Sequence, residues 1–293
     1  VIDLKSMKET RRVDLSPLIR PHGIQEINGK IYFSAEASRA IARYDPTTNK
    51  VDWIMGTGQN ASHMVVGSSD EKRFYTANIA SNSVTMFELQ AAPPSGSKIT
   101  QIPVGNQPEA IDLSPDGKEV WVGLNSEAKV EVIDTTQKKA VKKIDVGARP
   151  YRVKFTPDGK YVFINGNNTP RVARIDLTTF ETAEIIEVPN AGGNHSSPFT
   201  TENSEYVVAG TRFSVPIPQS DVAIEEYQDK FKGSLSFISV DPEHGHMDID
   251  FQILMPGYDY DLAHGGKGKE TSLHGTHWHA LLSAFVKKIP TQF

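Results

Sequence analysis

The chain has 293 residues, of which 38% are hydrophobic and 23% are charged, and its formal net charge at pH 7 is −5. This mild, dispersed charge argues against nucleic acid or an anionic membrane as a partner, and no apolar run reaches the roughly 18 residues of a membrane-spanning helix. The absence of cysteine excludes disulfides, thiolate metal ligands and cysteine nucleophiles.

The first third of the chain contains two units of short alternating strands. The first unit opens at residues 20–24, turns at Asn28–Gly29 and continues to residue 45. Because Asn-Gly is the preferred pair for a two-residue hairpin turn, these strands are expected to pair antiparallel. The second unit opens at residues 61–66, and its last strand follows a loop that contains proline and glycine.

The third and fourth units repeat one pattern. Each begins with a proline, Pro108 or Pro150, and the interval between these two positions is the length of one unit. Each first strand leads into a Pro-Asp-Gly turn, at 115–117 and 157–159, in which proline presets φ and glycine takes a positive φ. A period of about 40 residues, built from short strands, is typical of a β-propeller blade.

The pattern weakens toward the end of the chain. A fifth unit opens near residue 193 and carries an insertion at 213–232, where apolar residues at helical spacing predict a short amphipathic helix. After Gly257 the strand pattern fails, and residues 279–288 again have helical spacing. Either a sixth blade is degenerate or the chain lacks its end.

These observations predict an all-β fold, a single β-propeller domain over residues 1–293 with about seven four-stranded blades. Because the repeat argues for one closed ring, we expect one domain rather than two. Residues 270–293 are expected to be irregular, and the clear blades lie at about 20–60, 61–105, 106–147, 148–190 and 191–257.

One position recurs near the start of the first strand of each unit. In a β-propeller this strand lines the central channel, so the side chains at this position are expected to converge. Imidazoles and a carboxylate around one axis can bind a transition metal or act in acid–base chemistry. The alternative is that they fill the channel mouth and bind water. The position is occupied by His22, His63, Glu109, Tyr151 and His195.

The other histidines are weaker candidates. His244 and His246 lie in a turn sequence and are expected to be solvated. The tight cluster of His274, His277 and His279 is of a kind that binds metal when exposed, with or without a biological role.

The chain resembles two known families. Over about residues 20–165 it resembles the YVTN-type, lactonase-like β-propellers. The motifs are Ser-Pro-Asp-Gly-Lys at 114–118 with Val-Ile-Asp at 132–134, and Thr-Pro-Asp-Gly-Lys at 156–160 with Arg-Ile-Asp at 174–176. This resemblance implies a fold and little about chemistry.

Over about residues 158–269 the chain resembles the catalytic β-propeller of nitrous-oxide reductase, in its atypical branch. The motifs are Asp-Gly-Lys-Tyr-Val-Phe-Ile-Asn at 158–165, Pro-Arg-Val-Ala-Arg-Ile-Asp-Leu at 170–177, Gly-Thr-Arg-Phe-Ser-Val-Pro-Ile-Pro at 210–218 and Tyr-Asp-Tyr-Asp-Leu-Ala at 258–263. The resemblance implies a copper-dependent oxidoreductase of denitrification, with His195 as a copper ligand. Residues 149–152 stand where the family has a histidine pair, so we expect part of the ligand set to be lacking. The family also has a cysteine-bearing electron-entry domain, and because this sequence contains no cysteine we expect that domain to be lacking as well.

Three functions follow from these residues and resemblances. The first is a copper-binding propeller, periplasmic or secreted, that takes a small-molecule substrate and pairs with an electron-donor protein or a second copy of itself. Its expected metal ligands are His22, His63 and His195.

The second function is a lactonase-like hydrolase acting at the channel mouth, and the third is a non-catalytic binding scaffold. In the hydrolase, Glu109 or a histidine would activate water, and Arg149 or Arg152 would stabilise an anionic substrate or oxyanion. Whether the protein is an enzyme stays open at this point. The expected catalytic residues are Glu109, Tyr151 and Arg152.

Overall fold

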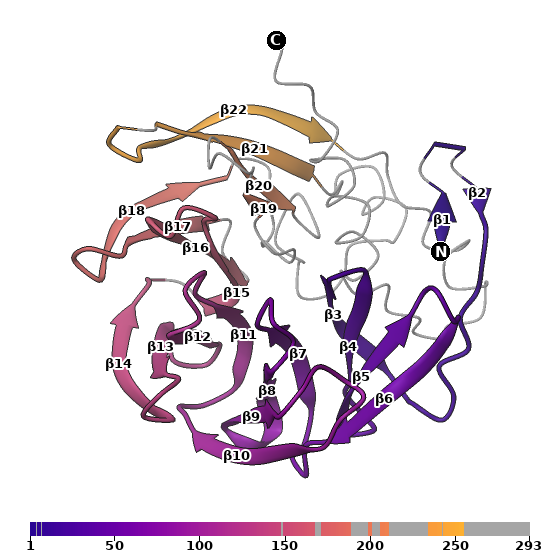
Figure 1. The fold of residues 1–293 in the computed structure, drawn as a ribbon. Helices are drawn as coiled ribbons and strands as arrows, with labels where there is room; N and C mark the ends of the chain where they lie inside the picture. Colours follow the sequence, from indigo (N-terminus) through magenta and orange to yellow (C-terminus); the bar gives the residue numbers. More distant parts are fainter. Residues whose placement is uncertain are drawn as a thin grey trace, which may run out of the picture. The chain divides into compact units, whose positions relative to one another are not determined.

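The computed structural model describes residues 1–3, 5–6, 8–147, 149–167, 171–188, 199–200, 206–210, 234–241 and 243–254. Within these residues the chain forms five four-stranded sheets and a two-stranded hairpin (Figure 1). In each four-stranded sheet the neighbours are consecutive strands, which is the arrangement of a propeller blade. The all-β propeller fold predicted from the repeats is confirmed.

The strands follow one another in simple order. The N-terminal hairpin pairs β1 (Ile2–Asp3) with β2 (Lys8–Glu9). Blade 1 contains β3 (Pro21–Ile27), β4 (Lys30–Ala35), β5 (Ala40–Asp45) and β6 (Lys50–Gly56). Blade 2 contains β7 (Ser62–Gly67), β8 (Arg73–Asn78), β9 (Ser83–Leu89) and β10 (Ser97–Pro103), with a short 3-10 helix at Ile79–Ser81.

The later blades have the same arrangement. Blade 3 contains β11 (Pro108–Leu113), β12 (Glu119–Leu124), β13 (Lys129–Asp134) and β14 (Lys139–Asp145). Blade 4 contains β15 (Arg149–Phe155), β16 (Tyr161–Asn167), β17 (Arg171–Asp176) and β18 (Glu181–Glu187). Blade 5 contains β19 (Phe199–Thr200), β20 (Tyr206–Gly210), β21 (Ser234–Val240) and β22 (Met247–Leu254).

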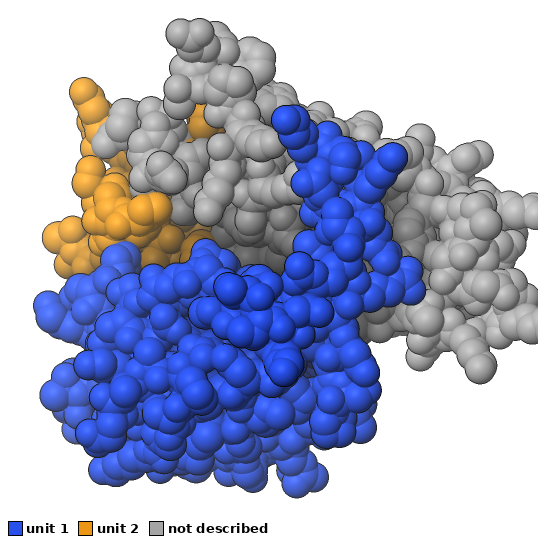
Figure 2. Space-filling view, turned by 45° about the vertical axis from the view of Figure 1, so that its right-hand side comes forward, with its two compact units in different colours: residues 1–127, 131–142 blue, residues 128–130, 143–293 orange. Residues whose placement is uncertain are grey.

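The chain divides into two compact units, coloured separately in Figure 2. Unit 1 comprises residues 1–127 and 131–142, and unit 2 comprises residues 128–130 and 143–293. Unit 1 therefore holds blades 1 and 2 and most of blade 3, whereas unit 2 holds blades 4 and 5. That residues 1–293 form a single domain stays a prediction.

The helices expected at 213–232 and 279–288 lie outside the described residues, as does the expected irregular segment at 270–293. In the part of the chain that the structure describes, no helix has the length and apolar character needed to cross a bilayer.

Turn residues define the hairpins as the sequence predicts. Asn28 and Gly29 both have positive φ, at 50° and 76°, as a two-residue hairpin turn with the right twist requires. In the Pro-Asp-Gly turn of blade 3, Gly117 has a φ of 71°. The N–H of Lys118 and the hydroxyl of Ser114 both donate to the Asp116 carboxylate, and these bonds lower the pKa of Asp116 to about 2.

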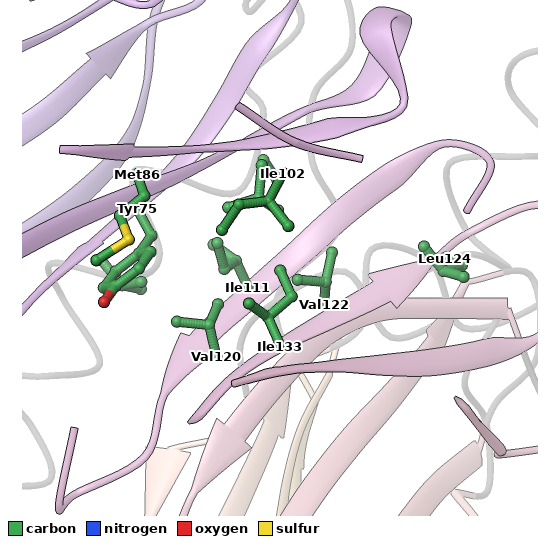
Figure 3. Close-up of a cluster of buried hydrophobic side chains, with 11 residues drawn as sticks. Tyr75, Met86, Ile102, Ile111, Val120, Val122, Leu124 and Ile133 are labelled. Carbon is green, nitrogen blue, oxygen red and sulfur yellow. The ribbon is translucent and has the colours of Figure 1, made fainter. Parts of the chain in front are cut away.

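An apolar cluster in unit 1 joins blades 2 and 3 (Figure 3). Alternate residues of a strand point to the same face of its sheet, so Val120, Val122 and Leu124 of β12 all enter this cluster. Removing this surface from water is the main favourable contribution to folding. The buried members are Val66, Tyr75, Ala77, Val84, Met86, Ile102, Ile111, Val120, Val122, Leu124 and Ile133.

A second cluster packs blade 1 against blade 2, and this packing positions β3 beside β7. Its centre is aromatic: the ring centroids of Tyr32 and Phe74 are 4.6 Å apart, and those of Trp53 and Phe74 are 5.5 Å apart. Unit 2 has its own core, which joins blades 4 and 5. The buried members of that core are Phe163, Val172, Val188, Val207, Ala209, Ile238, Val240 and Met247.

Two isoleucines of β10 test which part of this packing stabilises unit 1. Ile102 is fully buried in the cluster of blades 2 and 3, whereas Ile99 on the same strand is 42% exposed. We expect Ile102→Ala to lower the free energy of unfolding by about 2–5 kcal/mol because it leaves a cavity. Ile99→Ala should cost less than about 1 kcal/mol. Urea denaturation measures both, and equal losses would contradict the assigned core.

Candidate functional site

A β-bulge lies near the start of the first strand in four of the blades. The pairing of first and second strands shifts register between Pro21 and Ile24, Ser62 and Met64, Pro108 and Ala110, and Pro150 and Arg152. A bulge places an extra residue opposite one partner residue and re-aims its side chain. The recurring position found in the sequence is therefore a bulge position, and its residues in these blades are His22, His63, Glu109 and Tyr151.

In unit 1 the same backbone feature precedes each of these bulges. A non-glycine residue with positive φ, which is uncommon, turns the chain into the first strand. These residues are Arg20 (φ 59°), Ala61 (φ 54°) and Gln107 (φ 53°). The carbonyl of each accepts the N–H of the residue that follows the second strand, namely Glu36, Ile79 and Asn125, at 2.9, 3.0 and 2.9 Å respectively.

The bulges of β3 and β7 bring two histidines into contact. The ring centroids of His22 and His63 are 3.7 Å apart, with an angle of 33° between the rings, and both residues are only 6% exposed. In Figure 1, β3, β7 and β11 follow one another within unit 1, and β7 contacts both of the others. The first strands of three consecutive blades thus supply His22, His63 and Glu109 to one buried site.

Gly23 permits this approach because it has no side chain. A Cβ at this position would lie 2.7 Å from the Cα of Met64 and 2.9 Å from the backbone nitrogen of Val65. Ser34 of β4 links the two strands, since its hydroxyl accepts the N–H of Gly23 at 2.8 Å and donates to the carbonyl of His63. The two histidines are therefore held by backbone contacts as well as by their rings.

A carboxylate lies on each side of the His63 ring. On one side, Glu36 Oε2 is 3.7 Å from His63 Nδ1, and the exposed Arg20 contacts the same oxygen with its Nε at 3.3 Å. On the other side, Glu109 Oε1 is 3.4 Å from His63 Nε2. Asn125 donates from Nδ2 to the second oxygen of Glu109 at 2.8 Å. All these side chains except that of Arg20 are buried.

This arrangement matches the donor set of a transition-metal site. One ligand atom from each of His22, Glu36 and His63 can be chosen so that all three lie within 4.8 Å of one another. Two imidazoles and a carboxylate are donors that suit iron, zinc and copper. Neither ring nitrogen of His63 has a hydrogen-bond partner among the described residues, which is unusual for a buried polar side chain.

Unit 2 holds two of the sequence-predicted residues. Tyr151 occupies the bulge of β15, and Arg152 beside it is buried. The guanidinium of Arg152 lies 4.5 Å from the centroid of the Tyr151 ring, and its Nη1 donates to the Tyr151 carbonyl at 2.6 Å. Their convergence with the residues of unit 1 stays a prediction. His195, the remaining predicted ligand, lies outside the described residues.

Sequence reasoning overlooked Glu36 and Asn125. Both follow the second strand of their blade and pair back to the residue with positive φ, so they are equivalent positions. The equivalence of Glu36 and Asn125 is hard to see in the sequence, because Glu36 follows His22 at a shorter interval than Asn125 follows Glu109. The turn at Asn28–Gly29 is shorter than the Pro-Asp-Gly turn of blade 3, and the longer bulge of β3 offsets part of that difference. An alignment that allowed for turn length would have found them.

Comparisons with known proteins agree with the propeller. The model of the family described as YNCE-like beta-propeller matches residues 29–159. The Antigen Lp49 of Leptospira interrogans is 27% identical over 157 residues, which cover 46% of this chain. The matched part spans about a third, 33%, of the length of that relative.

Two solved structures share the fold at low sequence identity. Hydrazine synthase of Kuenenia stuttgartiensis matches with a TM-score of 0.69 and 20% identity, over 83% of this chain and 69% of that chain. A candidate 6-phosphogluconolactonase of Bacteroides uniformis matches with a TM-score of 0.59 and 15% identity, over 76% of this chain and 68% of that chain. These likenesses show the β-propeller fold. The resemblance of residues 158–269 to nitrous-oxide reductase stays a prediction.

Gly23 provides a test of the geometry that brings the histidines together. In Gly23→Ala the new methyl group would meet the backbone of β7, which cannot rotate away, so we expect a loss of about 1–3 kcal/mol in the free energy of unfolding. Gly56→Ala is the matched control because a Cβ at that position would have no atom within 4 Å outside its chain neighbours. That variant should change stability by less than about 0.5 kcal/mol. Equal effects in urea denaturation would contradict the close approach of β3 and β7.

Proposed function

We propose that this protein is a metal-binding β-propeller in which His22, His63 and Glu36 hold one divalent transition-metal ion, with copper as the expected metal. The observation that carries the proposal is the buried group of three potential ligand atoms. The ion would bind the buried ring of His63, whose two nitrogens have no hydrogen-bond partner among the described residues.

The distances support this assignment. Ligand atoms about 2.0–2.2 Å from a tetrahedral ion lie roughly 3.3–3.6 Å from one another. The separation of 3.7 Å between His63 Nδ1 and Glu36 Oε2 is close to that value. A small movement of either side chain would therefore bring both atoms into coordination.

The charges around the site also support a divalent cation. Glu36 and Glu109 contact opposite sides of the His63 ring, and both are buried. Two carboxylates balance the charge of a divalent ion when the imidazoles are neutral. Arg20 contacts Glu36 now, but its side chain is 59% exposed and can withdraw into solvent when the ion binds.

More specifically, we propose that the protein is a redox-active copper protein outside the cytoplasm, as the resemblance of residues 158–269 to nitrous-oxide reductase implies. Imidazole suits copper well, and the chain offers no cysteine thiolate that would compete for it. His195 would then add a further ligand, and an electron-donor protein would be the partner. A small-molecule substrate would enter at the same site.

Metal content and affinity test the proposal. The metal-free protein is loaded separately with Cu²⁺, Zn²⁺ and Fe²⁺, desalted and measured by mass spectrometry, and Kd is then measured by calorimetry. We expect one equivalent per chain, with copper held most tightly. His22→Ala and His63→Ala should each weaken binding by more than the roughly 10–100-fold that outer-shell changes typically cost.

Two variants control for binding elsewhere in the chain. Substituting alanine for both of the exposed residues His244 and His246 should leave the metal affinity unchanged. Substituting alanine for His274, His277 and His279 together measures what that cluster contributes to metal binding. Circular dichroism checks that each variant folds. Parent-like affinity in folded His22→Ala and His63→Ala would overturn the proposal, and His195→Ala shows separately whether that residue contributes.

A lactonase-like hydrolase is the second candidate, and the contact between Glu109 and His63 favours it. The two residues form a buried carboxylate–imidazole pair of the kind used in general acid–base catalysis. Metal-free protein would then hydrolyse simple lactones, and Glu109→Ala would lower kcat by about 10²–10⁴-fold. No turnover by metal-free parent protein would exclude this reading.

A further inference from the structure

We infer that Glu109 is a positioning residue: its Oε1, 3.4 Å from His63 Nε2 without a hydrogen bond in this structure, would accept the Nε2–H once the ion binds and so leave Nδ1 to coordinate it. The inference rests on the proposed function, because it concerns the tautomer of one proposed ligand. It assigns Glu109 a role different from that of a catalytic base.

The two nitrogens of His63 face different partners. Nδ1 is directed toward Glu36, with 3.7 Å between Nδ1 and Oε2, and Nε2 is directed toward Glu109, with 3.4 Å between Nε2 and Oε1. A neutral imidazole offers a lone pair on one nitrogen and an N–H on the other. Since Glu36 belongs to the ligand group and Glu109 does not, the metal is assigned to Nδ1 and the proton to Nε2.

Two successive hydrogen bonds fix the orientation of the Glu109 carboxylate toward His63. Its second oxygen accepts from Asn125 Nδ2 at 2.8 Å. The backbone N–H of Asn125 is bound in turn to the carbonyl of Gln107 at 2.9 Å. The orientation of the carboxylate is therefore set by the backbone of blade 3, whereas the ligand that it contacts belongs to blade 2.

The physical effect of such a contact is well defined. A carboxylate that accepts the distal N–H of a ligating histidine fixes the ring orientation and makes the ligating nitrogen more basic. The effect should be strong here because Glu109 is buried, at 9% exposure, where solvent screens little. Removing such a contact typically weakens metal binding by about 10–100-fold.

The experiment compares Glu109→Leu, which removes the acceptor, with Glu109→Gln, which retains a carbonyl oxygen. Zn²⁺ affinity is measured by calorimetry, and the tautomer of His63 is read from ¹⁵N–¹H spectra of the Zn²⁺-loaded protein. We expect Glu109→Leu to bind Zn²⁺ about 10–100-fold more weakly and to lose the protected Nε2–H signal. Glu109→Gln should retain that signal and most of the affinity.

Glu131→Leu is the matched control. Glu131 is a buried carboxylate of the same blade, but it lies on the third strand, β13, and accepts the N–H of Gly105 at 2.7 Å. Its replacement should leave both the Zn²⁺ affinity and the His63 signal unchanged. If Glu131→Leu and Glu109→Leu lost Zn²⁺ affinity and the His63 signal equally, Glu109 would act only by stabilising the fold, and the inference would be overturned.

Two further outcomes separate the inference from the proposed function. If the parent binds no metal, the proposed function fails and the inference with it. If the parent binds metal and Glu109→Leu has the same affinity and the same His63 tautomer, only the inference fails. The absorption spectrum of bound Co²⁺ reports the coordination number of the ion. A change in that number between the parent and Glu109→Leu would show that Glu109 is itself a ligand, and this also overturns a positioning role.

Discussion

The close approach of β3 and β7 at Gly23 is the constraint on which the site depends. With no side chain at this position, the backbone of the first blade lies directly against that of the second. Ser34 then bridges the two strands, and the rings of His22 and His63 meet at 3.7 Å. The carboxylate of Glu36 reaches His63 only because β4 is held in this register.

The site concentrates polar groups where the regular sheet is interrupted. Buried imidazoles and carboxylates cost stability unless they are paired or bind a cation. In unit 1 that cost is offset by the apolar cluster of blades 2 and 3 and by the aromatic packing of Tyr32, Trp53 and Phe74. Regular packing thus supports an irregular site, as is common at functional positions.

The repeated bulge gives four of the blades the same backbone geometry at a position whose side chain can vary. The same backbone feature recurs at His22, His63, Glu109 and Tyr151, although the side chains differ in charge and size. A propeller can therefore change its ligand or its reaction by substitution at these positions without altering the blade. This is why fold similarity to proteins such as hydrazine synthase carries no information about activity.

The sequence by itself determined the blades, their turns and the recurring position. These features depend on local chemistry: the alternation of strand side chains between the two faces of a sheet, the φ preferences of proline and glycine, and a period of about 40 residues. The same period also predicted that His22, His63 and Glu109 would occupy equivalent positions.

Only the tertiary structure decided which of these residues meet and through which atoms. Glu36 and Asn125 entered the site from the ends of second strands, where a difference in turn length obscured the repeat. The assignment of each His63 nitrogen to a carboxylate depends on how three blades pack, because a ring's orientation follows from contacts between strands that are distant in sequence.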